Sequence, residues 1–215
     1  MEPSPKGRYF YRCYSSASAG ALRCGKYPHV PRVLSQRQLL HEFSNHMRRR
    51  QIVPTALISV TVRPVEALYR ALEKYYASQQ DLEDPEEIWI AIIFPHHARE
   101  LAQQLDNEDA NAFKYEYLFE REIPMSYLKH NVSLKELIKR GLSPGMFLDA
   151  ERSFPSNLEE FRKVIMSEIL SDAYGAGRWL GGIARAFGVG APVYEIANKI
   201  FSDSLGNFGR IDRNR

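Results

Sequence analysis

Apolar positions along the chain follow two periods, and these periods predict its strands and helices. Alternating or continuously apolar runs, rich in β-branched and aromatic residues, predict strands over residues 8–15, 55–62, 88–94 and 113–119. A turn and one further short strand are expected within 123–134. Apolar residues three or four positions apart predict helices over residues 35–50, 64–79, 96–105, 133–141, 156–190 and 192–207. This mixture predicts an α+β fold.

Helix-end signals support several of these boundaries. Ser35 is a plausible N-cap of the first helix, and either Ser156 or Asn157 can cap the helical stretch that follows residue 155. Gly141 ends a short helix in the way that glycine commonly does. Interior glycines weaken the long helical stretch after Tyr174. The elements therefore have recognisable ends as well as recognisable faces.

The character of the chain changes near residue 150. Residues 8–145 mix strands and helices and are expected to form one domain, whereas residues 150–207 form a helical C-terminal extension. The extension carries no motif that can be attached to chemistry. Its apolar residues at helical spacing indicate a packing subdomain, and the alternative is an amphipathic surface that meets a partner or a lipid.

Composition and charge exclude some classes of protein. The chain has 215 residues, 44% hydrophobic and 26% charged, with a net charge of +3, which is typical of a globular domain. That charge is too small to indicate nucleic-acid binding by itself, although basic runs at 47–50 and 210–215 keep a nucleic-acid binder as a remote hypothesis. No apolar run reaches the roughly 18 residues of a membrane span. The first residues lack the apolar segment of a signal peptide, and the compartment stays open.

Cysteine usage leaves the redox compartment undecided. The two cysteines, Cys13 and Cys24, are too few for a disulfide framework, and there is no Cys-x-x-Cys. They could pair across a short loop in a secreted protein or stay reduced in a cytosol.

Polar residues interrupt three of the predicted strands. Arg12 lies within the first, Ser59 and Thr61 lie on one face of the second because they are two residues apart, and Glu116 lies in a later one. Each residue alone is compatible with solvent-facing alternation. Their order along the chain is the more informative feature.

This order, Arg then Ser-x-Thr then Glu, resembles the signature of ADP-ribosyltransferases, closest to the branch of the cholera toxin and heat-labile enterotoxin A chains. "YFYRCYS" resembles its opening strand, "LISVTVRPVEAL" its Ser-Thr-Ser strand and following helix, "EEIWIAIIF" its central apolar strand, and "YEYLFEREIPMSYL" its catalytic strand. The chain also resembles fungal enterotoxin-like domains that share Pro-Thr-x-x-Ile-Ser-Val. The resemblance covers about residues 8–140.

The resemblance implies an ADP-ribosyltransferase-like split β-sheet that binds NAD+ across the split. Glu116 would be the catalytic carboxylate, since its interval before Ile-Pro matches the family, whereas Glu120 and Glu122 would be loop or surface charges. Arg12 would grip the NAD+ pyrophosphate. The Ser59 hydroxyl would orient the glutamate and line the nicotinamide pocket.

The same resemblance implies two supporting residues. Thr61 stands where the family often has serine and can supply the same hydroxyl. The family often has a ligand-contacting histidine on the preceding helix, where His46 is preferred over His41; a surface histidine is the alternative. His96 and His97 lack His-Glu-x-x-His spacing, so no metal site is expected.

The implied activity is that of a mono-ADP-ribosyltransferase or NAD+ glycohydrolase, which uses NAD+ as its substrate. It would cleave the nicotinamide–ribose bond and transfer ADP-ribose to a protein acceptor or to water. Many arginine-modifying members carry Glu-x-Glu, and here Lys114 takes the first position. A cation there cannot act as a base at neutral pH unless its pKa is strongly lowered. The alternative is therefore an inactive module on the same fold, an effector or scaffold.

Overall fold

The computed structural model describes residues 8–31, 33–47, 54–76, 83–95 and 115–206. Five strands form one sheet: β1 Phe10–Tyr14, β2 Leu57–Thr61, β3 Trp89–Ile93, β4 Glu116–Glu120 and β5 Leu128–Ser133. The α-helices of the described residues are α1 Gln36–Met47, α2 Pro64–Tyr76, α3 Leu134–Lys139, α4 Leu158–Ser171, α5 Ala173–Ala186 and α6 Val193–Leu205. The predicted α+β class is confirmed, and the helix predicted over 96–105 lies outside the described residues.

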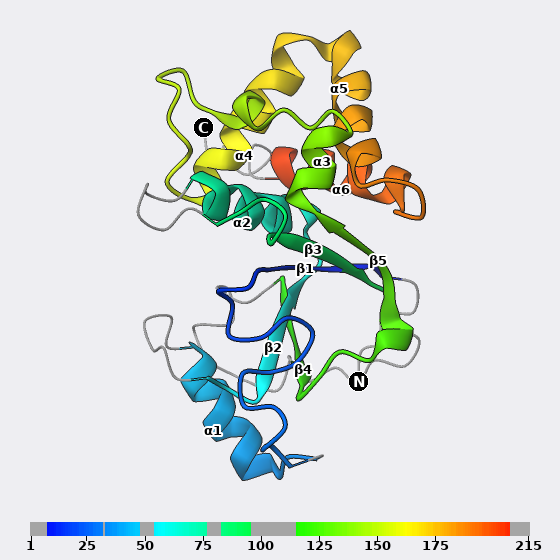
Figure 1. The fold of residues 1–215 in the computed structure, drawn as a ribbon. Coiled ribbons are helices and arrows are strands. Elements are labelled where there is room, and N and C mark those ends of the chain that lie inside the picture. The colour runs from blue at the N-terminus through cyan, green and yellow to red at the C-terminus, as the bar shows by residue number, and fades with distance from the viewer. Residues whose placement is uncertain (1–7, 32, 48–53, 77–82, 96–114, 207–215) are drawn as a thin grey trace.

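The sheet has the order β4-β2-β1-β3-β5, and every neighbouring pair is antiparallel. The β1–β3 and β2–β4 ladders each extend over five register positions. In contrast, β1 and β2 meet at one described position, Tyr11 opposite Thr61. Figure 1 shows the result, since β2 and β4 run across the direction of β1, β3 and β5. The sheet is thus opened between β1 and β2.

Alternation along β1 divides the interior into two cores. Tyr11 belongs to the larger core, between the sheet and helices α2–α6, whereas Phe10 belongs to a smaller core on the opposite face. Consecutive strand residues point to opposite faces, so neighbours in one strand serve different cores. Helix α2 places Val65, Leu68 and Leu72 in the larger core, as its predicted apolar face requires. Burial of these side chains fixes α2 on the sheet.

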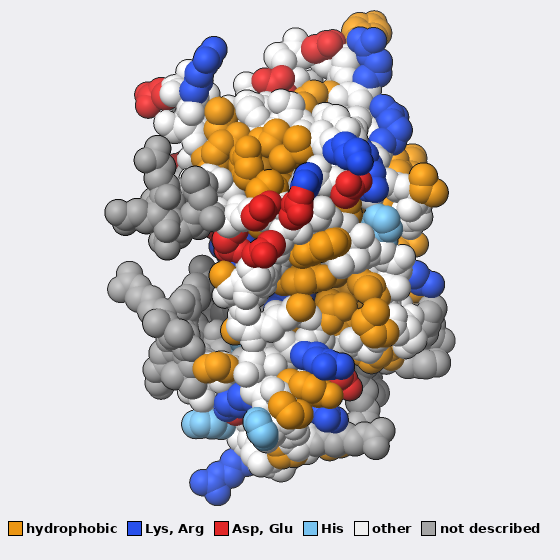
Figure 2. Space-filling view, viewed as in Figure 1, with side chains coloured by type: hydrophobic (Ala, Val, Ile, Leu, Met, Phe, Trp, Pro, Cys, Tyr) orange, Lys and Arg blue, Asp and Glu red, His pale blue; other side chains and the backbone are white. Residues whose placement is uncertain are grey.

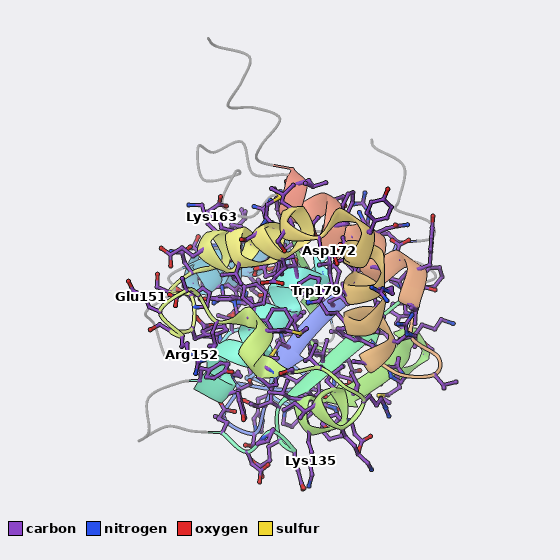
Figure 3. All side chains as sticks on the ribbon, turned by 90° about the horizontal axis from the view of Figure 1, so that it is seen from above. Lys135, Glu151, Arg152, Lys163, Asp172 and Trp179 are labelled. Carbon is purple, nitrogen blue, oxygen red and sulfur yellow. The ribbon has the colours of Figure 1, made fainter. Side chains whose placement is uncertain are left out.

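The stretch predicted as helical over 156–190 consists of two helices that meet at Asp172. Asp172 has a non-helical backbone, and its side chain caps α5 by accepting a hydrogen bond from the Gly175 N–H at 2.8 Å. Asn157 caps α4, and Ser156 donates its hydroxyl and backbone N–H to Glu160. Figure 3 shows Asp172 at the α4–α5 junction and Trp179 farther inside the bundle. The glycines after Tyr174 therefore lie in a separate helix, α5, whose N-terminus is capped by Asp172.

The C-terminal helices pack directly on the sheet domain. The larger core runs without interruption from Tyr11 of β1 through α2 into Ile165, Ile183 and Ile196 of α4, α5 and α6. In Figure 1 these helices lie on the same side of the sheet as α2, whereas α1 lies beside β2 on the other side. Within the described residues, no helix combines the length and apolar character needed to cross a bilayer.

Candidate active site

His46, Ser59 and Glu116 meet at the open side of the sheet. The His46 ring reaches from α1 to β2, where its Nε2 lies 2.5 Å from the Ser59 Oγ. The same Nε2 lies 3.7 Å from the Glu116 Oε1 on β4. On the other side of the ring, Nδ1 lies 2.9 Å from the Thr55 Oγ1. One imidazole therefore contacts two hydroxyl groups and a carboxylate, and it is held at both nitrogens.

The docking of α1 explains how His46 reaches β2. Glu42, one helical turn earlier on α1, is buried and accepts a hydrogen bond from the Ala56 N–H at 2.7 Å. Lys26 donates to the other carboxylate oxygen of Glu42. Burial raises the pKa of Glu42, but the bonds from Lys26 and Ala56 outweigh it and hold the pKa below its usual value. His41, the other histidine considered on this helix, is exposed, and its Nε2 lies 3.1 Å from the Asn45 Nδ2.

Arg12 spans the gap between β1 and β2. Its Nη1 donates to the Ser59 carbonyl at 2.8 Å, and its Nε and Nη2 donate to the carbonyls of Ala21 and Gly20 at 2.7 and 2.9 Å. Burial lowers the pKa of Arg12 to about 10, which leaves the guanidinium charged at neutral pH. Through these three hydrogen bonds, the Arg12 side chain connects β1 to β2 and to the loop after β1.

Thr61 lies two residues after Ser59 on β2, but its hydroxyl has partners other than His46. Its hydroxyl donates to the Glu66 Oε2 at 2.9 Å and accepts from the Arg63 N–H at 3.1 Å. Thr61 is the register partner of Glu116. The threonine hydroxyl therefore joins the end of β2 to the first turn of α2, while the Ser59 hydroxyl contacts His46.

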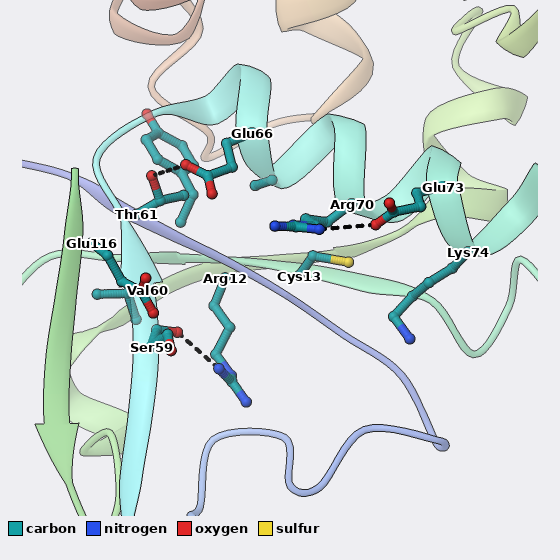
Figure 4. Close-up of a pocket in the computed structure, with 12 residues that line it drawn as sticks. Arg12, Cys13, Ser59, Val60, Thr61, Glu66, Arg70, Glu73, Lys74 and Glu116 are labelled. Atoms are coloured by element: carbon teal, nitrogen blue, oxygen red, sulfur yellow. Dashed lines mark hydrogen bonds and ion pairs between the residues drawn. The ribbon is translucent and has the colours of Figure 1, made fainter. Parts of the chain in front are cut away.

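A cavity of about 270 Å³ connects these residues (Figure 4). Arg12, Ser59, Thr61 and Glu116 line one part of it. Helix α2 adds a charged part of the wall through Glu66, Arg70, Glu73 and Lys74. The remaining lining residues are uncharged: Tyr11, Cys13, Val60 and Ala67. Only the apolar face of α2 stood out in the sequence. The spacing 66, 70, 73 and 74 could have revealed the charged wall, because it places all four side chains on one helical face.

Three of the four charged residues of the α2 wall form ion pairs. Arg70 Nη1 lies 3.1 Å from Glu73 Oε2, and Lys74 Nζ lies 2.7 Å from the Glu83 Oε1. On one face of the molecule, Figure 2 shows acidic side chains gathered at the level of α2 between apolar patches. The wall therefore presents both signs of charge to the cavity.

The two other glutamates of β4 and the segment after it lie outside the cavity, whereas Cys13 is one of the residues that line it. Glu120 accepts a hydrogen bond from the Leu34 N–H at 3.3 Å, and Glu122 forms an exposed ion pair with Arg23 at 3.8 Å. Cys13 and Cys24 are free thiols, and burial raises the pKa of Cys13 to about 12.

Metal ligands do not cluster in the described part of the chain, where no group of three or more His, Cys, Asp or Glu could hold an ion. His96, His97 and Lys114, which the sequence brought forward, lie outside the described residues.

Comparison with known proteins adds one finding. The sequence pattern of DUF7587, a domain of unknown function, matches residues 5–137. This range includes all five strands and every residue of the His46, Ser59 and Glu116 site. No curated protein and no solved structure gives a match. Because the matched range covers more than half of the 215 residues, the chain belongs to the DUF7587 family.

Proposed function

We propose that the cavity binds NAD+ and that the protein cleaves its nicotinamide–ribose bond, as an ADP-ribosyltransferase-like enzyme. One observation carries the proposal. Arg12, Ser59 and Glu116 come from three separate strands, yet they meet at a single opening in the sheet together with His46. Their order along the chain is the one that resembles ADP-ribosyltransferases, and that resemblance supplies the substrate class.

The residues suit the chemistry of this bond. Cleavage develops positive charge on the ribose, and a preorganised carboxylate beside it is an effective electrostatic stabiliser. Glu116 is half-buried, with 27% of its side chain exposed, and His46 lies within ion-pair distance of it. His46 also contacts the Ser59 hydroxyl. The contacts of His46 restrict where the Glu116 carboxylate and the Ser59 hydroxyl can lie. Both groups are therefore positioned without a bound substrate.

Arg12 and the cavity volume define how NAD+ would fit. Arg12 keeps its charge and retains N–H groups beyond the three bonded to carbonyls, which suits the oxygens of a pyrophosphate. A volume of about 270 Å³ lies just below the range of roughly 300–1,000 Å³ that is typical of small-molecule sites. The cavity would therefore enclose one part of the dinucleotide, with the rest along its open side.

The acceptor of ADP-ribose is either water or a protein side chain. Lys114 stands where arginine-modifying enzymes of this type carry a second carboxylate. A general base must be able to accept the acceptor's proton, and a lysine ammonium cannot do so. Hydrolysis, or transfer to an acceptor that needs no such base, is therefore proposed over transfer to arginine.

The test is nicotinamide release from NAD+ by the purified chain and by a Glu116→Gln variant. Loss of the carboxylate charge is expected to reduce release by about 10² to 10³-fold, with the unfolding midpoint unchanged. Glu120→Gln is the matched control, since it makes the same change four residues later on β4, at a carboxylate outside the cavity. This control is expected to keep the wild-type rate within about twofold.

Two results would contradict the proposal. Equal rates for Glu116→Gln and the wild-type chain would remove Glu116 from the chemistry. If the wild-type chain neither released nicotinamide nor bound NAD+ in calorimetry, the enzyme hypothesis would fail.

A non-catalytic interaction module is the second candidate, and one observation favours it. The Arg12 guanidinium is engaged by the carbonyls of Gly20, Ala21 and Ser59, which is a structural use of the side chain. A module predicts no NAD+ binding in calorimetry, whereas the enzyme predicts binding that Glu116→Gln preserves.

A further inference from the structure

A buried charge cluster joins α6 to the end of β2, next to the start of β4. Arg63 follows β2 and is 8% exposed. Its Nε lies 3.7 Å from the Asp203 Oδ2 on α6. In the described part of the chain neither of these two atoms has a hydrogen-bond partner. The ion pair is therefore the interaction through which each charge compensates the other.

Asp203 is itself held in place by a second arginine. Arg162 on α4 is also 8% exposed, and its Nη2 donates to the Asp203 carbonyl oxygen. Its Nη1 forms a 3.1 Å ion pair with Glu159. The end of α6 is thus bonded to α4, and Asp203 presents its carboxylate to Arg63 from a fixed position.

Arg63 transmits this position to β4. Its guanidinium carbon lies 4.4 Å from the centre of the Tyr115 ring, a cation–π distance. The Tyr115 carbonyl accepts a hydrogen bond from the Val62 N–H at 3.1 Å. Tyr115 immediately precedes Glu116, the first residue of β4. Among the described residues, β2 is the one strand that pairs with β4. Arg63 supports the start of β4 from a different direction.

We propose that Asp203 is a positioning residue for Glu116, which acts through Arg63 and the Tyr115 ring. The C-terminal helices then support the position of a site residue. None of the described residues of α4–α6 lines the cavity, and the DUF7587 match ends before these helices. The catalytic part of this inference rests on the proposed function. The structural part, that α6 fixes the first residues of β4, does not.

Hydrogen exchange followed by mass spectrometry tests the structural part without any turnover. Asp203→Asn leaves the buried Arg63 without its counter-charge, and Tyr115→Leu removes the ring that Arg63 contacts. Each variant is expected to exchange the amides of residues 115–120 on the order of tenfold faster, with β3 amides unchanged. Glu195→Gln is the control, because it removes one negative charge from α6 about two turns away from Asp203.

Kinetics test the catalytic part. Asp203→Asn and Tyr115→Leu are expected to lower kcat for nicotinamide release on the order of tenfold with KM for NAD+ unchanged, whereas Tyr115→Phe, which keeps the ring, should retain the wild-type rate. Effects in the Asp203→Asn/Tyr115→Leu double variant should not add, because both changes act through Arg63.

The outcomes separate the two proposals. A wild-type chain that releases no nicotinamide refutes the proposed function, while the exchange result still decides whether α6 positions β4. Wild-type exchange of residues 115–120 in Tyr115→Leu overturns the positioning, even if Asp203→Asn fails to fold. Uniform acceleration of all peptides in Asp203→Asn also overturns it, because such a change reports global stability alone.

Discussion

At the scale of single residues, the site depends on side chains that bond to the backbone of other elements. Arg12 donates to carbonyls of Gly20, Ala21 and Ser59, and Glu42 accepts from the Ala56 N–H. Neither feature follows from the sequence, since residue type does not show which carbonyl a guanidinium will meet. The sequence did bring forward Arg12, Ser59 and Glu116, and their roles in catalysis remain predictions.

Arg12→Lys tests the structural role of the guanidinium. A lysine ammonium is a point donor and cannot reproduce the planar fork that reaches three carbonyls. Hydrogen bonds to charged groups contribute roughly 1.5–3 kcal/mol each, so we expect the free energy of unfolding to fall by about 2–4 kcal/mol in urea denaturation. Arg37→Lys, at an exposed position of α1, should leave it unchanged. An unchanged midpoint for Arg12→Lys would show that the three carbonyls do not depend on the guanidinium.

At the scale of elements, periodicity predicted most strands and helices, whereas helix caps determined where individual helices begin. Ser35 is a cap signal that the structure confirms, because its Oγ accepts from the Gln38 backbone N–H at 3.4 Å and its own N–H donates to the Gln38 Oε1 at 2.9 Å. The break at Asp172 was missed because aspartate within a helical pattern is ordinary. It becomes a cap only through its bond to Gly175.

Gly175 and Gly177 give a matched pair of substitutions on α5. A Cβ on Gly175 would lie 1.9 Å from the Asp172 Oδ2, whereas a Cβ on Gly177 would meet nothing within 4 Å. Gly175→Ala should therefore disrupt the cap and lower the free energy of unfolding by about 1–2 kcal/mol. Gly177→Ala should raise it by roughly 0.5–1 kcal/mol through helix propensity. Thermal unfolding of the two variants side by side measures both, and equal shifts of the same sign would contradict the cap.

At the scale of the whole molecule, the predicted boundary near residue 150 does not coincide with a gap in packing. The larger core includes residues of β1, β3 and α2 together with Ile165, Ile183 and Ile196 of the C-terminal helices. The sequence could not show this continuity, because contacts such as those between α2 and α6 join residues that lie far apart in the chain. It equally could not show the strand order β4-β2-β1-β3-β5, which brings Ser59 and Glu116 together.

A shared core predicts cooperative unfolding of the whole chain. Trp89 lies on β3 and Trp179 on α5, so each tryptophan reports one side of the predicted boundary. We expect Trp89→Phe and Trp179→Phe, each with one remaining tryptophan, to unfold in urea as single transitions. After correction for the small stability change of each substitution, the midpoints should coincide with that from circular dichroism. Two separate transitions would show that the C-terminal helices unfold independently.

The single register position between β1 and β2 has a mechanical consequence. The β2–β4 ribbon carries Ser59 and Glu116, whereas β1 carries Arg12, and Tyr11 opposite Thr61 is the ladder position that joins them. Because one ladder position joins them, the β2–β4 ribbon and the β1, β3 and β5 strands can change their relative angle without breaking a long ladder. The hydrogen bond from the Arg12 guanidinium to the Ser59 carbonyl crosses the same junction between β1 and β2. A ligand that binds between Arg12 and Glu116 is therefore expected to change the angle between the two halves of the sheet as well as the separation of these two side chains.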